Sequence, residues 1–415
     1  MRSLTRQFVM AMTFGITTIG TLDAQGTRVR TVVDSMVGSV GGVAVDRSGA
    51  IYVADFGETV WKVFPDGRSK IFATGLYGAS GNAIDAQGNL LQANFYGHYI
   101  SKIDRWGNHE IYADSGFAGP VGIAADPDGS FYVLNCSNNT ITKILPDRSV
   151  TTFAQSSLLN CPNGITRAQD GHLYVVNFSD GRMLKVTPSG EVAEFATLPG
   201  GGNGHVAIAR GALYATSFQG QRVYRVSFAG EVTLLTGTGA IGEQNGPAAE
   251  ATFSWPNGIA AGPQGDRVYI NDYLNRSRLT PEVPSVPRWS LRQITLASLS
   301  AVMVSGLQSG GVQGLVDAQR GWKDDPATAA INTEQEVNAL GYQLMGGGNL
   351  AAATAVFELN VEAYPNAWNT HDSLGEAYMN AGQNEKAIAS YQKSLELNPA
   401  NTNATDMIAK IRGGS

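Results

Sequence analysis

The sequence is short of charge and of cysteine. Lysine, arginine, aspartate and glutamate make up 15% of its 415 residues, well below the roughly 25% of an ordinary soluble domain. Its 29 basic residues are spread thinly among 35 acidic ones, with a net charge of −6, which argues against the clustered basic face of a nucleic-acid-binding protein. The two cysteines form no CxxC pair and no zinc-type cluster with histidine. A phosphate-binding loop, an HExxH motif and a Ser-His-Asp arrangement are also missing.

Long apolar runs are equally scarce. The run over residues 8–22 is too short to span a hydrocarbon core of about 30 Å as a helix. Because Arg2 and Arg6 precede it, we predict a secretory signal peptide over residues 1–24, with an uncleaved anchor as the alternative. Residues 294–307 are the next most apolar stretch, but they are few and include three serines. We therefore expect no stable membrane span and an exported protein, periplasmic or extracellular.

Glycine and apolar residues, by contrast, are plentiful. The chain has 50 glycines, and 43% of its residues are hydrophobic, which is enough for a core and excludes general disorder. One pattern of the type Gly-Ile-Ala-Ala-Asp recurs six times at intervals of 39, 41, 42, 41 and 53 residues. A Gly-containing turn and further β-rich runs follow each copy. The copies begin at Gly42, Gly81, Gly122, Gly164, His205 and Gly258.

Four short strands per unit, repeated six times, predict a six-bladed β-propeller. The last unit lacks a clear fourth strand, so we predict that residues 27–34 complete it. These units resemble NHL repeats and the six-bladed family of gluconolactonase, regucalcin and strictosidine-synthase-like proteins. The resemblance covers residues 27–297 and includes the NHL-like stretch over residues 234–259. The resemblance implies the fold strongly. It implies no single function, because this fold hosts lactonases, lyases and binding modules alike.

The C-terminal part of the sequence repeats at 34 residues. Residues 334–367 and 368–401 carry Leu-Gly, Ala, an aromatic residue and Pro at equal offsets, which resembles tetratricopeptide repeats. We place an irregular unit at 299–333, in an all-α domain over 299–411, because three units are the usual minimum. The matching residues are Leu340, Gly341, Ala353, Phe357 and Pro365 in the first repeat, and Leu374, Gly375, Ala387, Tyr391 and Pro399 in the second.

The resemblance to tetratricopeptide repeats implies a groove that binds protein. Its predicted groove-facing residues are neutral to acidic, so they are not suited to clamp a carboxylate. A neutral or basic partner segment and packing against the propeller are both left open. These groove residues are Asn338, Tyr342, Asn369, Asp372, Glu376 and Asn380.

In such propellers the first strands begin and the second strands end on one face around the channel. The second-strand ends form a polar ring that is a candidate site for a small molecule or peptide. The alternative is that these side chains only bind the backbone of the adjoining turns. The ring residues are Asp55, Asn94, Asn135, Asn177, Ser217 and Asp272.

The position after each ring residue is aromatic in five blades and cysteine in the third. This collar either packs between blades or forms an apolar pocket mouth. Cys136 and Cys161 lie on the same face one blade apart, and we predict a disulfide between them. The collar residues are Phe56, Phe95, Cys136, Phe178, Phe218 and Tyr273.

The gluconolactonase resemblance implies a divalent metal held by Glu, Asn, Asn and Asp at the starts of four first strands. This sequence has Gly41, Val121, Asn163 and Gly204 there, so only Asn163 matches. We therefore predict no metal and no cofactor. A divalent metal is expected only under the alternative that the protein is an enzyme. Asn257 repeats the Pro-Asn-Gly motif of Asn163 and joins the predicted ligand-binding residues.

Two functions follow from these patterns, and a purely structural scaffold is a third. The first is binding of a small molecule or partner at the propeller face, with recruitment of protein by the helical repeats. The alternative is a hydrolase or lyase of the gluconolactonase or streptogramin-lyase type. Its candidate catalytic residues are His205, as a general base, and Asn163, together with the carboxylates of Asp55 and Asp272.

Overall fold

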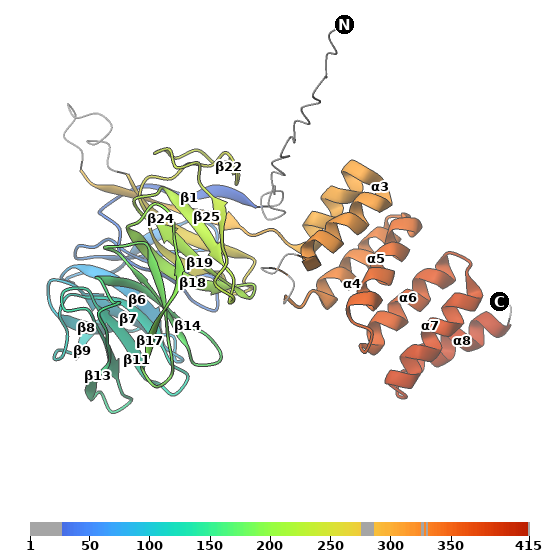
Figure 1. Ribbon diagram of the computed structural model, residues 1–415, viewed down its shortest axis with the longest axis horizontal. Coiled ribbons are helices and arrows are strands. Elements are labelled where there is room, and N and C mark those ends of the chain that lie inside the picture. The colour runs from blue at the N-terminus through green and yellow to red at the C-terminus, as the bar shows by residue number, and fades with distance from the viewer. Residues whose placement is uncertain (1–26, 275–285, 325–327, 329–330, 414–415) are drawn as a thin grey trace, which may run out of the picture.

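The computed structural model describes residues 27–274, 286–324, 328 and 331–413. The signal peptide predicted at residues 1–24 lies outside them. The described chain forms a six-bladed β-propeller followed by a helical region, as predicted (Figure 1). No helix among the described residues is both long and apolar enough to cross a membrane.

Each of the first five blades is a four-stranded antiparallel sheet whose strands follow chain order outward from the axis. Apolar side chains of neighbouring blades interlock, which explains why the strands lack simple alternation. The first three blades are β2 (Val43–Val45), β3 (Ile51–Ala54), β4 (Val60–Val63) and β5 (Ser69–Ala73); β6 (Ala79–Ile84), β7 (Leu90–Asn94), β8 (Tyr99–Ile103) and β9 (His109–Ala113); and β10 (Pro120–Ala125), β11 (Phe131–Asn135), β12 (Thr140–Ile144) and β13 (Val150–Gln155). The fourth and fifth are β14 (Pro162–Arg167), β15 (Leu173–Asn177), β16 (Arg182–Val186) and β17 (Val192–Thr197); and β18 (Asn203–Ala209), β19 (Ala212–Ser217), β20 (Arg222–Val226) and β21 (Val232–Thr236).

The sixth blade joins the two ends of the propeller sequence. Its strand order is β22-β1-β25-β24-β23, and β1 runs antiparallel to β25, with Val29 opposite Ile294. The prediction that the N-terminal strand completes the last blade is therefore confirmed. The strands are β1 (Arg28–Val37), β22 (Gly246–Pro247), β23 (Pro256–Ala261), β24 (Arg267–Leu274) and β25 (Arg288–Thr295).

The repeated glycine has a steric cause. The first strands surround the axis so closely that a side chain at Gly81 would collide with the carbonyl oxygen of Val121 in the next blade. Gly122 and Gly258 face the backbone of their neighbouring blades in the same way. The motif therefore marks the innermost strand of each blade.

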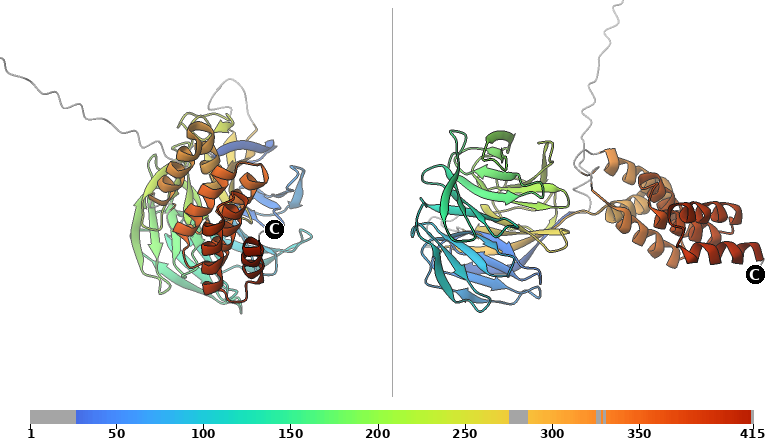
Figure 2. Two further views of the ribbon diagram at one scale, coloured as in Figure 1. Left: turned by 90° about the vertical axis from the view of Figure 1, so that its right-hand side faces the viewer. Right: turned by 90° about the horizontal axis from the view of Figure 1, so that it is seen from below.

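The helical region extends from one side of the propeller, with α8 farthest from it (Figures 1 and 2). At the junction, Arg210 in the β18–β19 turn donates a hydrogen bond to the carbonyl oxygen of Ala297 (3.2 Å). The predicted irregular unit contains α3, which is interrupted by non-helical backbone at Gly310 and Gly311. The helices are α3 (Leu299–Asp324), α4 (Glu334–Gly346), α5 (Leu350–Ala363), α6 (Trp368–Asn380), α7 (Asn384–Leu397) and α8 (Thr402–Gly413).

The two regular repeats pack as their sequence pattern predicts. A side chain at Gly341 in α4 would collide with the ring of Phe357 in α5. Gly375 in α6 stands in the same relation to Tyr391 in α7. The Leu-Gly and aromatic positions thus let the two helices of each repeat approach closely.

Candidate functional site

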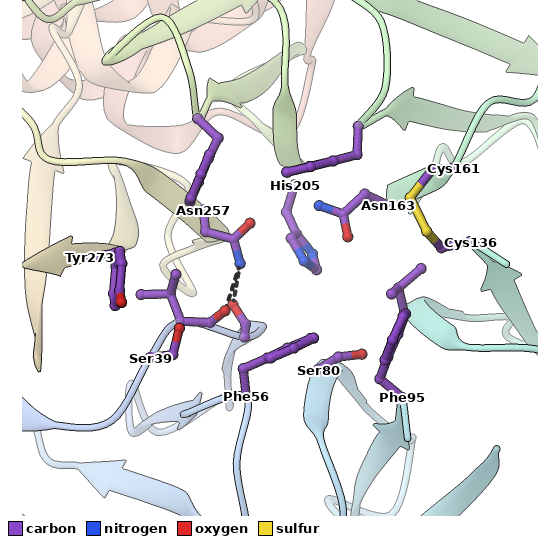
Figure 3. A pocket seen from close by; sticks show the side chains of 15 residues that line it. Ser39, Phe56, Ser80, Phe95, Cys136, Cys161, Asn163, His205, Asn257 and Tyr273 are labelled. Carbon is purple, nitrogen blue, oxygen red and sulfur yellow. Dashed lines mark hydrogen bonds between the residues drawn. A yellow bond between two sulfur atoms is a disulfide. The ribbon is translucent and has the colours of Figure 1, made fainter. Parts of the chain in front are cut away.

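A cavity of about 320 Å³ lies on the propeller axis, on the face where the second strands end (Figure 3). All six blades contribute to its wall. Most of the lining is apolar, and among the residues that the structure describes no lysine, arginine, aspartate or glutamate is part of it. The lining residues are Ser39, Val40, Gly41, Phe56, Ser80, Phe95, Val121, Cys136, Cys161, Asn163, Phe178, His205, Phe218, Asn257 and Tyr273.

The predicted collar forms the aromatic part of this wall. All six of its residues line the cavity. The collar also packs between blades, because the ring centroids of Phe56 and Phe95 are 5.6 Å apart and those of Phe178 and Phe218 are 5.8 Å apart. The two interpretations of the collar are thus compatible.

The collar residue of the third blade, Cys136, is one half of a disulfide. Cys136 and Cys161 are bonded, which confirms the predicted pairing. The bond joins the end of the third blade's second strand to the residue before the fourth blade's first strand. Closing a loop of this sequence separation, 25 residues, stabilises a fold by on the order of 3 kcal/mol.

Two asparagines bring amide groups to the cavity from the innermost strands. The Nδ2 atom of Asn163 donates a hydrogen bond to the carbonyl oxygen of Gly204 (2.9 Å), in the next blade. The Nδ2 atom of Asn257 does the same toward Gly41 (2.9 Å). Both asparagines therefore tie neighbouring blades together. Neither Oδ1 atom has a hydrogen-bond partner within the described part of the chain, so both can accept from a ligand.

His205 also lines the cavity, with its imidazole side chain. Its imidazole points into the cavity between Asn163 and Asn257 (Figure 3). The ring borders the cavity yet is surrounded by protein, and this desolvation lowers the pKa of His205 to about 4. The ring is therefore neutral at pH 7, and among the described residues it has no hydrogen-bond partner.

The predicted polar ring lies elsewhere. Its six side chains are turned away from the cavity and do not line it. They bind the backbone of adjoining loops instead, which is the alternative considered for these residues in the sequence analysis. The Asp55 carboxylate accepts from the N–H groups of Gly57 and Thr59, and Asn94 accepts from that of Tyr77. The remaining contacts join Asn135 to Ala118, Asn177 to Asn160, Ser217 to Pro199, and Asp272 to Ser254.

Of the eight predicted ligand-binding residues, Asn163 and Asn257 line the cavity. Sequence reasoning missed Ser39, Val40 and Ser80 as lining residues. A signal for Ser80 was present, because it occupies the same repeat position as Asn163 and Asn257, directly before the motif glycine.

The cavity does not fit the hard divalent cation of gluconolactonase-like sites. Such cations prefer carboxylates among several oxygen ligands, whereas the cavity offers two amide oxygens and an imidazole. Among the described residues, no three His, Cys, Asp or Glu side chains are grouped so that they could hold a metal.

The predicted groove residues mostly contact neighbouring helices. The hydroxyl group of Tyr342 donates to Glu376 (3.0 Å) and lies 3.1 Å from the hydroxyl oxygen of Ser373, and these contacts join α4 to α6. Asn369 donates to Glu334, and Asn380 contacts the sulfur of Met345. Asp372 accepts from Asn401 and Asn403 near α8. The Oδ1 atom of Asn338 is buried, and no hydrogen-bond partner for it is found among the described residues.

Comparison with known structures supports the fold. A gluconolactonase from Xanthomonas campestris is 17% identical, with 66% of this chain and 92% of that chain covered and a TM-score of 0.52. An auxiliary nutrient binding protein from Bacteroides ovatus is 14% identical, with coverage of 66% and 77% and a TM-score of 0.53. A protein of unknown function from Bacteroides thetaiotaomicron is 15% identical, with coverage of 66% and 76% and a TM-score of 0.55. At these identities the likeness establishes the fold alone.

Comparison with protein families identifies the family of the propeller and the repeat of the helical region. No curated protein matches the sequence significantly. Residues 368–401 match the tetratricopeptide repeat. Residues 27–236, half of the chain and most of the propeller, match the virginiamycin B lyase family. The chain therefore belongs to the virginiamycin B lyase family and carries tetratricopeptide repeats after its propeller.

Proposed function

We propose that the propeller binds an uncharged, mainly apolar small molecule in its axial cavity. The observation that carries this proposal is the composition of the wall, which combines aromatic rings with uncharged polar groups. The volume of about 320 Å³ lies at the lower end of the roughly 300–1,000 Å³ of small-molecule sites. A charged ligand would lose its hydration without gaining a counter-charge from the described wall, which is costly. A neutral ligand can instead donate to the free oxygens of Asn163 and Asn257.

Replacing Val40 with phenylalanine is expected to weaken binding at least tenfold, because the larger side chain occupies the cavity. The neutral fluorophore prodan is the probe, and its Kd is measured from the shift of its emission. Ile111→Phe is the matched control, since Ile111 is an exposed residue of an outer strand. Equal affinities for Val40→Phe and the wild type, with unchanged Tm values, would contradict cavity binding.

A second candidate function is lyase or hydrolase activity at the same cavity. It is favoured by the neutral, unpartnered imidazole of His205, which can accept a proton from a bound substrate. Virginiamycin B and glucono-δ-lactone are the substrates to test, because they represent the two kinds of relative.

His205→Gln is expected to lower kcat at least 100-fold on whichever substrate is consumed. Because the pKa of His205 is about 4, the imidazole stays unprotonated and competent as a base from pH 5 to 8, and its activity declines only as the pH falls through 4. His109→Gln, on the outer strand β9, is the control. The candidate fails if neither substrate is consumed or if His205→Gln retains the wild-type rate.

For the helical repeats we propose a basic protein segment as partner. Helices α4 and α6 carry Glu334, Asp372 and Glu376 but no lysine or arginine. The acidic side chains are held in place by hydrogen bonds from neighbouring helices, so they present a fixed negative surface.

An octapeptide of alternating lysine and serine is expected to bind more tightly than its glutamate counterpart. Glu376→Gln is expected to reduce its affinity about threefold, as for an exposed ion pair, and added salt to reduce it further. Fluorescence anisotropy of labelled peptides measures both effects. Glu396→Gln, on α7, removes a charge outside this set and serves as control. Equal binding of the two peptides would refute the charge preference.

We also propose that the protein is exported. The Cys136–Cys161 disulfide supports this proposal, because structural disulfides persist in oxidising compartments.

A further inference from the structure

Two exposed tyrosines adjoin the cavity. Tyr77 lies in the loop between β5 and β6, and Tyr96 lies in the turn between β7 and β8. Their exposed fractions are 59% and 52%, which is high for large aromatic side chains that contact each other. We call this pair the tyrosine shelf.

The shelf is continuous with the cavity wall. The ring of Tyr96 meets the ring of Phe95 edge to face, with centroids 5.2 Å apart and an angle of 87°. The ring centroid of Tyr96 also lies 5.7 Å from that of Phe56 and 5.7 Å from that of Tyr77. Because Phe56 and Phe95 line the cavity, a single aromatic surface runs from the cavity onto the shelf.

The local backbone holds the shelf in place. A Cβ atom at Gly78 would lie 2.7 Å from Cδ2 of Tyr96, and Gly78 has a φ of +75° that favours glycine. The N–H group of Tyr77 donates to Oδ1 of Asn94 (3.0 Å), and that of Gly78 donates to the carbonyl oxygen of Gly57 (3.0 Å). The rings therefore rest on a fixed loop, with faces left to solvent.

We propose that the tyrosine shelf is a second subsite, which takes an aromatic ring of the same neutral ligand that occupies the cavity. This inference rests on the proposed binding function. The cavity of about 320 Å³ is roughly twice the ~150 Å³ cavity that holds one benzene. One ring and a linker of similar volume fill it, so that a second ring of such a ligand extends onto the shelf. The exposed rings offer the stacked or edge-to-face contacts that an aromatic group prefers.

Two neutral probes separate the cavity from the shelf. N-acetyl-phenylalaninamide carries one ring, and N-acetyl-phenylalanyl-phenylalaninamide carries two. The Kd of each is measured by displacement of prodan from the full chain. The double variant Tyr77→Ser/Tyr96→Ser is expected to bind the two-ring probe about tenfold more weakly and the one-ring probe less than twofold more weakly. Tyr77→Phe/Tyr96→Phe, which keeps both rings, is expected to bind both probes as the wild type does.

Trp106→Ser is the matched control. Trp106 is 69% exposed, but it lies in the turn between β8 and β9, at the opposite end of the blade. Equal losses for both probes in the serine variant would overturn the subsite and assign the tyrosines to support of the cavity wall. Unchanged affinities would overturn it as well. If the wild type binds neither probe nor prodan, the proposed cavity function itself fails, and the subsite fails with it.

Discussion

Arg292→Met is expected to lower the free energy of unfolding by about 3–5 kcal/mol. Arg292 and Asp272 are both fully buried in the sixth blade, with Nη1 of the arginine 3.2 Å from Oδ2 of the aspartate. Arg292 also donates to the carbonyl oxygens of Gln244 and Thr252, which lie in the long segment between β21 and β23. Its removal leaves a buried carboxylate without a counter-charge and releases that segment.

The pH dependence of this variant gives a second, independent readout. Burial raises the pKa of Asp272 to about 7 against the lowering effect of Arg292, and loss of the guanidinium raises it further. The folded variant then binds a proton that the unfolded chain has released above pH 4. The stability of the wild type is therefore expected to level off above pH 7, whereas that of the variant is expected to keep falling.

Arg292→Met/Asp272→Asn is the matched control. The amide oxygen introduced by the second substitution can still accept from the N–H group of Ser254, as the Asp272 carboxylate does, but carries no charge. This double variant is expected to recover at least half of the lost stability at pH 7. Urea unfolding followed by far-UV circular dichroism measures all three chains. A loss below about 1 kcal/mol in the single variant, or no recovery in the double variant, would contradict the assigned role of the ion pair.

The propeller and its closure could be predicted because steric demands repeat along the chain. Close contact of the innermost strands requires a small residue once per blade, so Gly81, Gly122 and Gly258 record the blade period in the sequence. The same logic holds in the helices, where Gly341 marks the approach of Phe357. Both signals depend on local sequence offsets alone.

The site was harder to predict because side-chain direction at a strand end depends on the following turn. Phe56 has a φ of +55° and Cys161 a φ of +46°, which regular alternation does not anticipate. Polar residues such as Asp55 therefore bind the loops, while the next residue reaches the cavity. Tyr77 and Tyr96 lie in loops outside the repeated positions, so no periodic pattern indicated the shelf.

The largest expected effect concerns β1, which closes the ring. A chain that begins at Gly38 is expected to lose on the order of 5 kcal/mol or more of its free energy of unfolding. Val29 and Val33 of β1 are buried, and each such side chain contributes about 1.5–3 kcal/mol. The strand also forms the ladder with β25, and Arg288 of β25 donates to the carbonyl oxygen of Ser35 (2.7 Å).

A truncation at the C-terminal end is the control for the role of β1. Ending the chain at Asn401 takes away α8, which packs on α7 and has no strand of the propeller as neighbour among the described residues. The truncated chain is therefore expected to keep the unfolding transition of the propeller and its affinity for prodan. Loss of β1 instead exposes the edge of β25 and is expected to abolish both, since an unclosed ring leaves an unpaired, apolar strand edge that favours aggregation. If the chain lacking β1 remained monomeric with an unchanged Tm, closure by the N-terminal strand would not be what holds the six blades together.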